Sequence, residues 1–149
     1  MIRSLARGAL AGAAATVAMS IVMKVSGLAG LMGQQPPERI VERGMASADE
    51  PPDPVAVDAL AVIGHLAFGT VSGAAFGLVM NARALRTAQL LALPWGLGIW
   101  LVSYVGWIPA LGILPPPPED RPGRAWTMLV AHVVYGGALG AAWRALRHR

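Results

Sequence analysis

Apolar and polar residues are separated along this chain on the scale of whole segments. Four long apolar runs alternate with short stretches that hold nearly all of the charges. About 20 apolar residues are enough for a helix to cross the hydrocarbon core of a bilayer. Within lipid, a helix also satisfies its own backbone hydrogen bonds. The pattern predicts four membrane-spanning helices, at about residues 8–33, 55–81, 89–114 and 123–143.

The connecting segments predict an all-α, four-transmembrane-helix bundle that forms one integral membrane domain over residues 1–149. Asp53 followed by Pro54 is typical of a helix start. Pro115 to Pro118 cannot continue a helix and should close the third span. Pro94 and Pro109 lie inside that span and predict a kink or an unwound stretch. Residues 34–54 and 115–122 would be outer loops, and residues 82–88 a cytoplasmic loop.

Charge placement predicts the orientation of the spans. The side with both termini carries seven arginines and no acidic residue: Arg3, Arg7, Arg83, Arg86, Arg144, Arg147 and Arg149. The other side carries four arginines: Arg39, Arg43, Arg121 and Arg124. Because cytoplasmic loops are enriched in lysine and arginine, both termini should face the cytoplasm of a bacterial inner (plasma) membrane. Trp95 and Trp143 would mark the inner interface, and Trp126 the outer one.

Composition narrows the function classes. Only 13% of the residues are charged, against about 25% in an average soluble domain. The absence of cysteine excludes disulfides and thiolate metal sites. The net charge of +4 comes from arginines at span ends, which predicts contact with anionic lipids at the cytoplasmic face rather than with nucleic acid. No enzyme motif is present, so the sequence favours a non-enzymatic protein.

The second and fourth spans share a motif. His65, Phe68, Gly69 and Gly73 align without a gap with His132, Tyr135, Gly136 and Gly140. The ends of the first and third spans match more faintly. We therefore expect two helical-hairpin repeats, each a helix, an acidic proline-containing outer loop and a histidine helix. Since each repeat crosses the membrane twice, the two would be parallel.

Several short motifs, spread over nearly the whole chain, resemble a known family. They are Gly8-Ala-Leu-Ala-Gly12, Pro36-Pro-Glu-Arg-Ile40, Gly64-His-Leu-Ala-Phe-Gly69, Trp107-Ile-Pro-Ala-Leu-Gly112 and His132-Val-Val-Tyr-Gly136. The chain is similar in them to small four-span bacterial inner-membrane proteins of unknown function, and distantly to YagU-type proteins. The resemblance implies a fold and a location, and no established reaction.

Small residues recur on the predicted helices at the spacing of one helix face. In lipid, helices associate by close packing, so such residues mark contact surfaces. The candidates are Gly8, Gly12, Thr16, Ser20, Gly69, Gly73, Gly77, Gly136 and Gly140. They fit either a tightly packed bundle or a face that binds a second copy or other membrane subunits.

Five polar or amphipathic residues are expected at similar depth in the outer half of the membrane. This polar layer consists of Lys24, His65, Tyr104, Trp107 and His132. Ionisable groups within a membrane are costly and commonly functional. Lys24 has an alternative, because its long side chain can snorkel to the outer interface.

Three functions remain open from the sequence. The first is an accessory or assembly component that binds other membrane subunits through the small-residue faces. The second is a small carrier with a proton- or solute-handling site formed by Lys24, His65, Tyr104 and His132. The third is a b-type haem protein with His65 and His132 as axial ligands, in which Gly69 and Gly136 make room for the porphyrin.

The first outer loop carries two further features. Its acidic residues, including Asp49, Glu50, Asp53 and Asp58, are expected to be solvated rather than to bind a cation. Residues 37–46 predict a short surface helix that rests Ile40, Val41 and Met45 on the outer leaflet.

Overall fold

A computed structural model describes residues 1–45, 53–81 and 85–147, and the regular structure of these residues is helical. The long helices are α1 (Ile2–Leu28), α3 (Pro54–Val79), α4 (Leu85–Trp100) and α6 (Pro122–Arg147). Helix α4 continues into a π-helix, η1 (Leu101–Trp107), and a short α5 (Ile108–Ala110). Helix α2 (Pro36–Met45) lies in the first connection. The all-α four-helix bundle is thereby confirmed.

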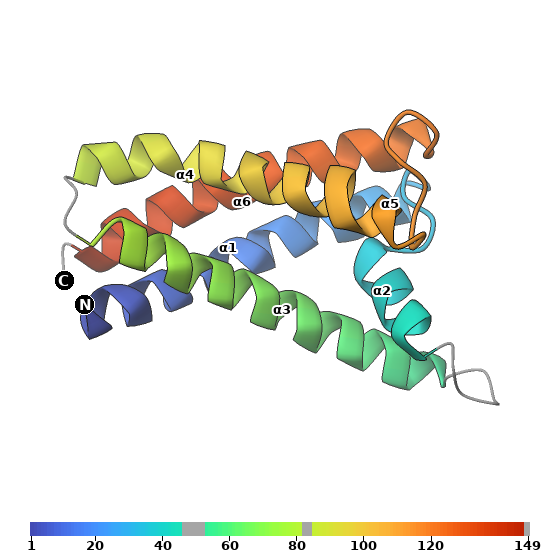
Figure 1. Ribbon diagram of the computed structural model, residues 1–149, viewed down its shortest axis with the longest axis horizontal. Helices are drawn as coiled ribbons and strands as arrows, with labels where there is room; N and C mark the ends of the chain where they lie inside the picture. Colours follow the sequence, from blue (N-terminus) through green and yellow to red (C-terminus); the bar gives the residue numbers. More distant parts are fainter. Residues whose placement is uncertain (46–52, 82–84, 148–149) are drawn as a thin grey trace.

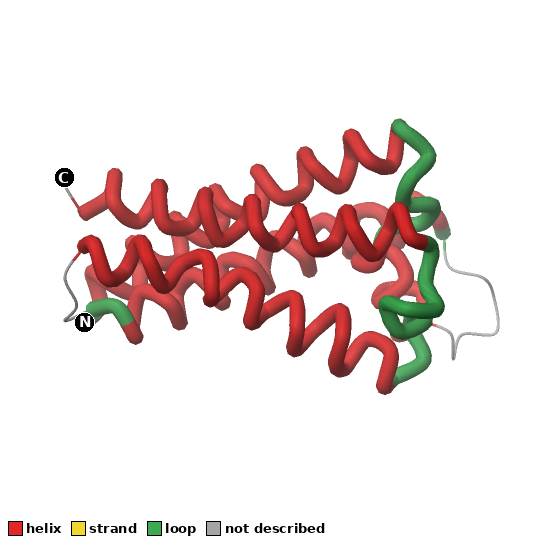
Figure 2. The backbone as a smooth tube through the Cα atoms, turned by 90° about the horizontal axis from the view of Figure 1, so that it is seen from above, coloured by secondary structure: helices red, strands yellow, loops and turns green. Residues whose placement is uncertain are grey.

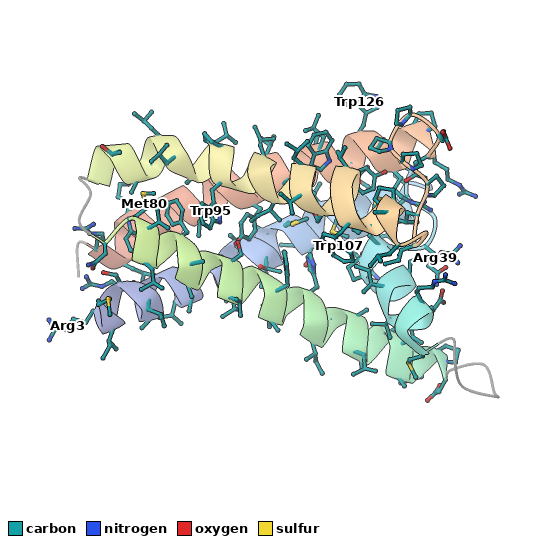
Figure 3. All side chains as sticks on the ribbon, viewed as in Figure 1. Arg3, Arg39, Met80, Trp95, Trp107 and Trp126 are labelled. Atoms are coloured by element: carbon teal, nitrogen blue, oxygen red, sulfur yellow. The ribbon has the colours of Figure 1, made fainter. Side chains whose placement is uncertain are left out.

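Four stretches are long and apolar enough to cross a membrane: Ile2–Leu28, Pro54–Val79, Thr87–Ala110 and Pro122–Arg147. The chain therefore has the character of a multi-pass membrane protein. Both termini lie at one end of the bundle, and α2 lies at the other (Figure 1). Below, the two are called the terminal end and the α2 end. Arg3 and Arg39 mark these opposite ends, and Trp126 points away from the helices (Figure 3).

The helices are not equally close to one another. Helix α1 packs against both α3 and α6, and α6 also packs against α4. Helix α3 runs beside α1 at the terminal end and diverges from the bundle toward the α2 end, where α2 packs against it (Figures 1 and 2). The order α3–α1–α6–α4 is closed into a ring at the terminal end by aromatic side chains. Phe76 of α3 contacts Trp95 of α4 and Trp143 of α6, with ring centroids 5.6 and 5.8 Å apart.

The small residues bring α1 and α3 into direct backbone contact. A Cβ atom placed on Gly73 would lie 2.5 Å from the Cα atom of Gly12, and one placed on Gly8 would lie 2.9 Å from the Cα atom of Gly77. Gly69 faces the side chain of Thr16. Both faces of this contact are therefore used within the chain, as expected for tightly packed helices in lipid.

The second hairpin repeats this close approach between α4 and α6. A Cβ atom on Gly136 would lie 2.9 Å from the Cα atom of Leu93, and one on Gly140 would lie 3.1 Å from the Cβ atom of Ala92. Of the nine small residues proposed for packing, Thr16 and Ser20 also line an open groove, which is described below.

The helix bounds differ from the expected spans at both ends of α1. The helix begins at Ile2 rather than Gly8 and ends at Leu28 rather than Gly33. Gly30 and Gly33 have φ angles of +76° and +63°, a left-handed conformation that stops a right-handed helix and that glycine adopts readily. At the far end of the chain, α6 extends beyond residue 143 to Arg147.

The irregularity expected in the third span is confirmed, and it takes the form of a π-helix. The Ile108 N–H donates to the Ser103 carbonyl, five residues earlier, instead of the four of an α-helix. Pro109 follows directly and has no N–H to donate, so it cannot complete a regular turn. Pro94, in contrast, lies inside α4 without ending it.

Two tryptophans that were expected to mark the inner interface pack against other helices of the chain. Trp143, expected at the inner interface, is fully buried against Phe76. Trp95 is half-buried and donates a hydrogen bond to the Ser72 hydroxyl at 3.1 Å. Both side chains close the bundle at its terminal end, because the aromatic residues of three helices meet there. Trp126, expected at the outer interface, is 69% exposed.

Candidate functional site

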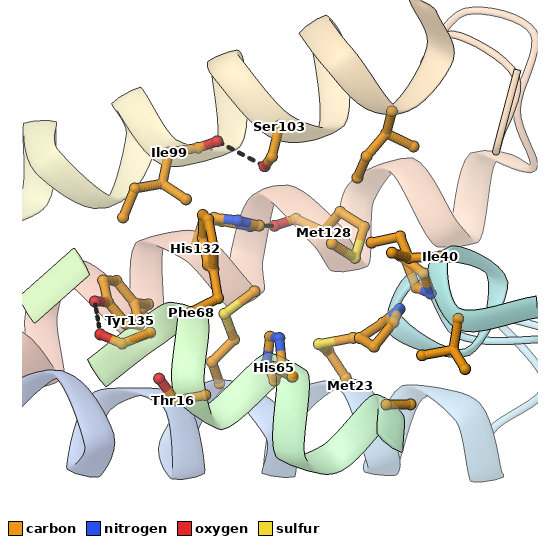
Figure 4. Close-up of a pocket in the computed structure, with 18 of the residues that line it drawn as sticks. Thr16, Met23, Ile40, His65, Phe68, Ile99, Ser103, Met128, His132 and Tyr135 are labelled. Carbon is orange, nitrogen blue, oxygen red and sulfur yellow. Dashed lines mark hydrogen bonds between the residues drawn. The ribbon is translucent and has the colours of Figure 1, made fainter. Parts of the chain in front are cut away.

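An internal cavity of about 240 Å³ opens where α3 diverges from α4. Its walls come from α1, α2, α3, the α4–η1–α5 helix and α6 (Figure 4). Most of the lining is apolar, from methionine, isoleucine, leucine, proline and aromatic side chains. Leu60, Gly64 and Phe68 of α3 line the cavity and are also exposed. The cavity therefore reaches the side of the bundle, which faces lipid in a membrane protein.

His132 of α6 projects into this cavity and has a defined hydrogen bond (Figure 4). Its Nδ1 atom lies 2.7 Å from the carbonyl oxygen of Met128. A carbonyl oxygen only accepts hydrogen bonds, so Nδ1 must carry the hydrogen. In the neutral ring, Nε2 is then left with a lone pair and can accept a hydrogen bond from a ligand.

His65 of α3 lines the same cavity from the opposite wall (Figure 4). Its Nε2 atom is buried and has no hydrogen-bond partner in the described part of the chain. A buried polar atom without a partner costs roughly 1–3 kcal/mol. His65 and His132 are thus brought together by the fold, and they supply hydrogen-bonding groups in an otherwise apolar space.

The π-helix places further polar groups at this cavity. Ser103 and Trp107 both line it from η1. The Ser103 hydroxyl donates to the Ile99 carbonyl at 2.6 Å, which leaves the oxygen able to accept. Tyr135 lies on the opposite side and donates to the Gly69 carbonyl at 3.0 Å, tying α6 to α3.

Tyr104, one residue after Ser103, belongs to a different polar cluster at the α2 end. Its hydroxyl donates to the Asp120 carboxylate at 2.6 Å. Arg124 pairs with the same carboxylate at 2.7 Å, and its Nε donates to the Met32 carbonyl at 2.9 Å. All three side chains are buried. The cluster fastens the loop before α6 to η1 and to the segment that follows α1, and it does not line the cavity.

Lys24 is not part of the cavity either. It is exposed and lines a separate groove between α1 and α3. It lies four residues before the end of α1, or about 6 Å along the axis at 1.5 Å per residue. The expected layer of five residues is therefore divided: His65, Trp107 and His132 meet at the cavity, while Tyr104 and Lys24 lie apart from it.

The structure fills the space that a porphyrin would need beside the two glycines. Gly69 packs on Thr16 of α1, and Gly136 packs on Ala92 and Leu93 of α4. Both glycines serve helix contact because their helices approach neighbours there. The described residues also contain no group of three or more histidine, aspartate or glutamate side chains suited to a metal ion.

Helix α2 has a different role from the one its sequence suggested. Ile40 and Val41 line the cavity together with Pro36 and Pro37, so this face covers the cavity instead of resting on lipid. The helix packs against α3, whose divergence leaves an apolar wall for it to cover. Met45 is half-buried. Of the acidic loop residues, Asp49 and Glu50 lie outside the described residues.

Sequence reasoning did not identify several residues of the two sites. Ser103 had no signal beyond a lone hydroxyl in an apolar run. The Asp120–Arg124 pair did have one, because opposite charges four residues apart at a helix start lie on one face. Gly64 was visible only as part of the histidine motif. A Cβ atom placed on it would meet no atom within 4 Å, so this position has open space beside it.

The chain was compared with protein-family models, curated proteins and solved structures, and none of them matches it. The resemblance to YagU-type proteins therefore stays a prediction. Fold and site together show a four-helix protein of multi-pass membrane character with a lateral, histidine-bearing cavity.

Proposed function

We propose that this protein binds a lipid-soluble small molecule in the cavity between α3 and η1, with its polar head between His65 and His132. One observation carries the proposal: two histidines on different helices face one apolar cavity that reaches the lipid-facing side of the bundle. Ligand sites are commonly concave and apolar, with a few converging polar groups that fix orientation.

The ligand class follows from the lining. The His132 Nε2 atom can accept a hydrogen bond, and the unpartnered His65 Nε2 can accept or donate according to its tautomer. Ser103 offers one more oxygen. A ring or chain that carries one or two hydroxyl groups would use these groups, because a hydroxyl both donates and accepts hydrogen bonds. Its apolar body would contact Met23, Phe68 and Met128. Hydroquinones and isoprenoid alcohols share this chemistry.

This proposal keeps a smaller site for the carrier interpretation, and we prefer it to the accessory interpretation. The carrier site would rest on His65 and His132, since Lys24 and Tyr104 lie elsewhere. The accessory interpretation relied on small-residue faces for partners, but eight of the nine residues face other helices of the same chain or are buried between them. The haem interpretation lacks the space that Gly69 and Gly136 were expected to leave.

The proposal also includes the location and orientation of the protein in the cell. Arginine placement favours a bacterial inner membrane with both termini in the cytoplasm. The cavity would then lie in the outer half of the bilayer, nearest to α2. The matched hairpins α1–α3 and α4–α6 support two parallel repeats, because each pair meets through the glycines of its histidine motif.

Native mass spectrometry with a short-chain hydroquinone as probe, kept under reducing conditions, tests the binding site. We expect one saturable adduct on the wild-type protein, weakened by His132→Leu and abolished by Gly64→Phe. The phenyl ring would occupy the open space beside Gly64. Gly137→Phe is the matched control, because Gly137 is exposed on α6, does not line the cavity and has no neighbour within 4 Å of an added Cβ atom. Equal adduct levels in Gly64→Phe and wild type would rule the cavity out.

A further inference from the structure

A second hollow, of about 490 Å³, lies between α1 and α3 at the α2 end. Unlike the histidine cavity, it has charged residues of both signs in its walls. Lys24 comes from α1, Asp58 from α3, and Gln35 and Glu38 from the start of α2. Four partly exposed aliphatic side chains also line this groove: Val17, Ile21, Val62 and Leu66. The remaining lining residues are Thr16, Ser20, Pro37, Ala61 and His65.

The two charged residues on the long helices lie equally far from their helix ends. Lys24 is four residues before the end of α1 at Leu28, and Asp58 is four residues after the start of α3 at Pro54. Each is therefore about 6 Å from its helix end. For a membrane-spanning helix, we expect that position to lie near the border between hydrocarbon and head groups. The aliphatic residues lie further along both helices, toward the membrane centre.

The charges across this groove are not neutralised by the protein. Among the described residues, neither Lys24 nor Asp58 forms an ion pair. Glu38 accepts a hydrogen bond from the Gln35 backbone N–H at 2.9 Å, which occupies only one of its oxygens. One wall thus offers an ammonium group and the opposite wall offers carboxylates, above an apolar floor.

We infer that this groove binds a phospholipid whose head group carries a phosphate and a primary ammonium, as in phosphatidylethanolamine. Lys24 would pair with the phosphate, and Asp58 and Glu38 would accept hydrogen bonds from the ammonium. An acyl chain would lie along Ile21 and Val62. A trimethylated choline head group has no N–H to donate, and a glycerol head group has no cation, so neither satisfies both walls.

The inference does not depend on the histidine cavity, although His65 lines both hollows. Gly64 lines the cavity and not the groove. Gly64→Phe should therefore abolish hydroquinone binding and leave phospholipid binding unchanged. Failure of one proposal is then distinguishable from failure of the other.

The test is native mass spectrometry of the delipidated protein in detergent, titrated with three phospholipids that have identical acyl chains. We expect phosphatidylethanolamine to bind about tenfold more tightly than phosphatidylcholine or phosphatidylglycerol. Lys24→Gln and Asp58→Asn should each weaken phosphatidylethanolamine binding by about tenfold. Both residues are exposed, so the substitutions should not disturb folding, which circular dichroism checks.

Arg39→Gln is the matched control, because it removes a positive charge at the same end of the bundle from an exposed residue that does not line the groove. It should bind phosphatidylethanolamine like the wild type. Equal affinities for the three lipids would overturn the inference. So would wild-type affinity for phosphatidylethanolamine in both Lys24→Gln and Asp58→Asn.

Discussion

The two hairpins meet along two interfaces, and these differ in how closely their helices approach. Helices α1 and α6 pack together, with Ala11, Ala15 and Ala131 fully buried. Helices α3 and α4 touch through Phe76, Trp95 and Ser72 near the terminal end and then separate (Figure 1). A parallel repeat with exact pseudo-twofold symmetry would make these two interfaces alike. The departure from symmetry is what creates the histidine cavity.

The separation of α3 from α4 follows from where the row of closely packed glycines on α3 ends. Gly77, Gly73 and Gly69 hold one half of α3 against α1. Beyond Gly69, α3 presents His65 and Ala61, and these residues line both the cavity and the groove between α1 and α3. Helix α3 thus makes close backbone contact where glycines face α1. It borders a hollow where larger residues take their place on that face.

Gly73→Phe should have the largest effect, because it places a ring where the backbones of α1 and α3 touch. A Cβ atom there would already lie 2.5 Å from the Gly12 Cα atom. We expect a loss of more than about 4 kcal/mol, well beyond a typical substitution. Thermal unfolding in detergent measures it. Gly137→Phe, on an exposed face of α6, should leave the melting temperature nearly unchanged, and equal losses in both variants would contradict the close contact.

Arg124→Met should have the second largest effect, because it removes one partner of a buried ion pair at the α2 end. Asp120 would stay buried without its cation, and the Met32 carbonyl would lose a donor. Breaking such a pair costs about 3 kcal/mol. The same unfolding assay measures it, with the exposed neighbour Arg121→Met as control. A loss no larger than that of the control would mean that the pair does not hold the loop before α6 in place.

Gly64→Phe should have the smallest effect on stability, and it tests the difference between the closely packed and the separated helices most directly. The substitution matches Gly73→Phe in size and lies on the same helix, but it faces the open interface. Loss of a helical glycine favours folding by about 0.5–1 kcal/mol, so the melting temperature should stay level or rise slightly. Its unfolding curve is compared directly with that of Gly73→Phe. A severe loss in both variants would show that the cavity closes in solution.

The sequence predicted the helices well because each apolar run is long and its ends carry strong signals, such as Asp53 and Pro54. The Asp53 side chain does accept a hydrogen bond from the Val55 N–H at 3.1 Å. The sequence also predicted that His65 and His132 lie on matched helices. Periodicity could not say which neighbour a glycine faces, so Gly69 and Gly136 were open to a porphyrin interpretation until the packing of Thr16 and Leu93 was seen.

Lys24 lies nearer to its helix end than the apolar pattern suggested, and the cause is local. The apolar pattern continues to Met32, but the helix stops at Leu28 before two glycines with left-handed backbone. Lys24 is therefore one turn from the helix end, where the interface is near. The bond between Tyr104 and Asp120 joins residues 16 positions apart across a proline-rich loop, and no short-range pattern indicates it.

The π-helix makes the third span tolerant of a one-residue deletion in one place. Each π turn holds about one residue more than an α turn, so η1 acts as an absorbed single-residue insertion. Deleting one residue within Leu101–Trp107 would restore a regular helix, and the residues before and after it would keep their faces. A deletion in the regular part of α4, where no π turn takes it up, would rotate all that follows by about 100°, the angle of one helical residue.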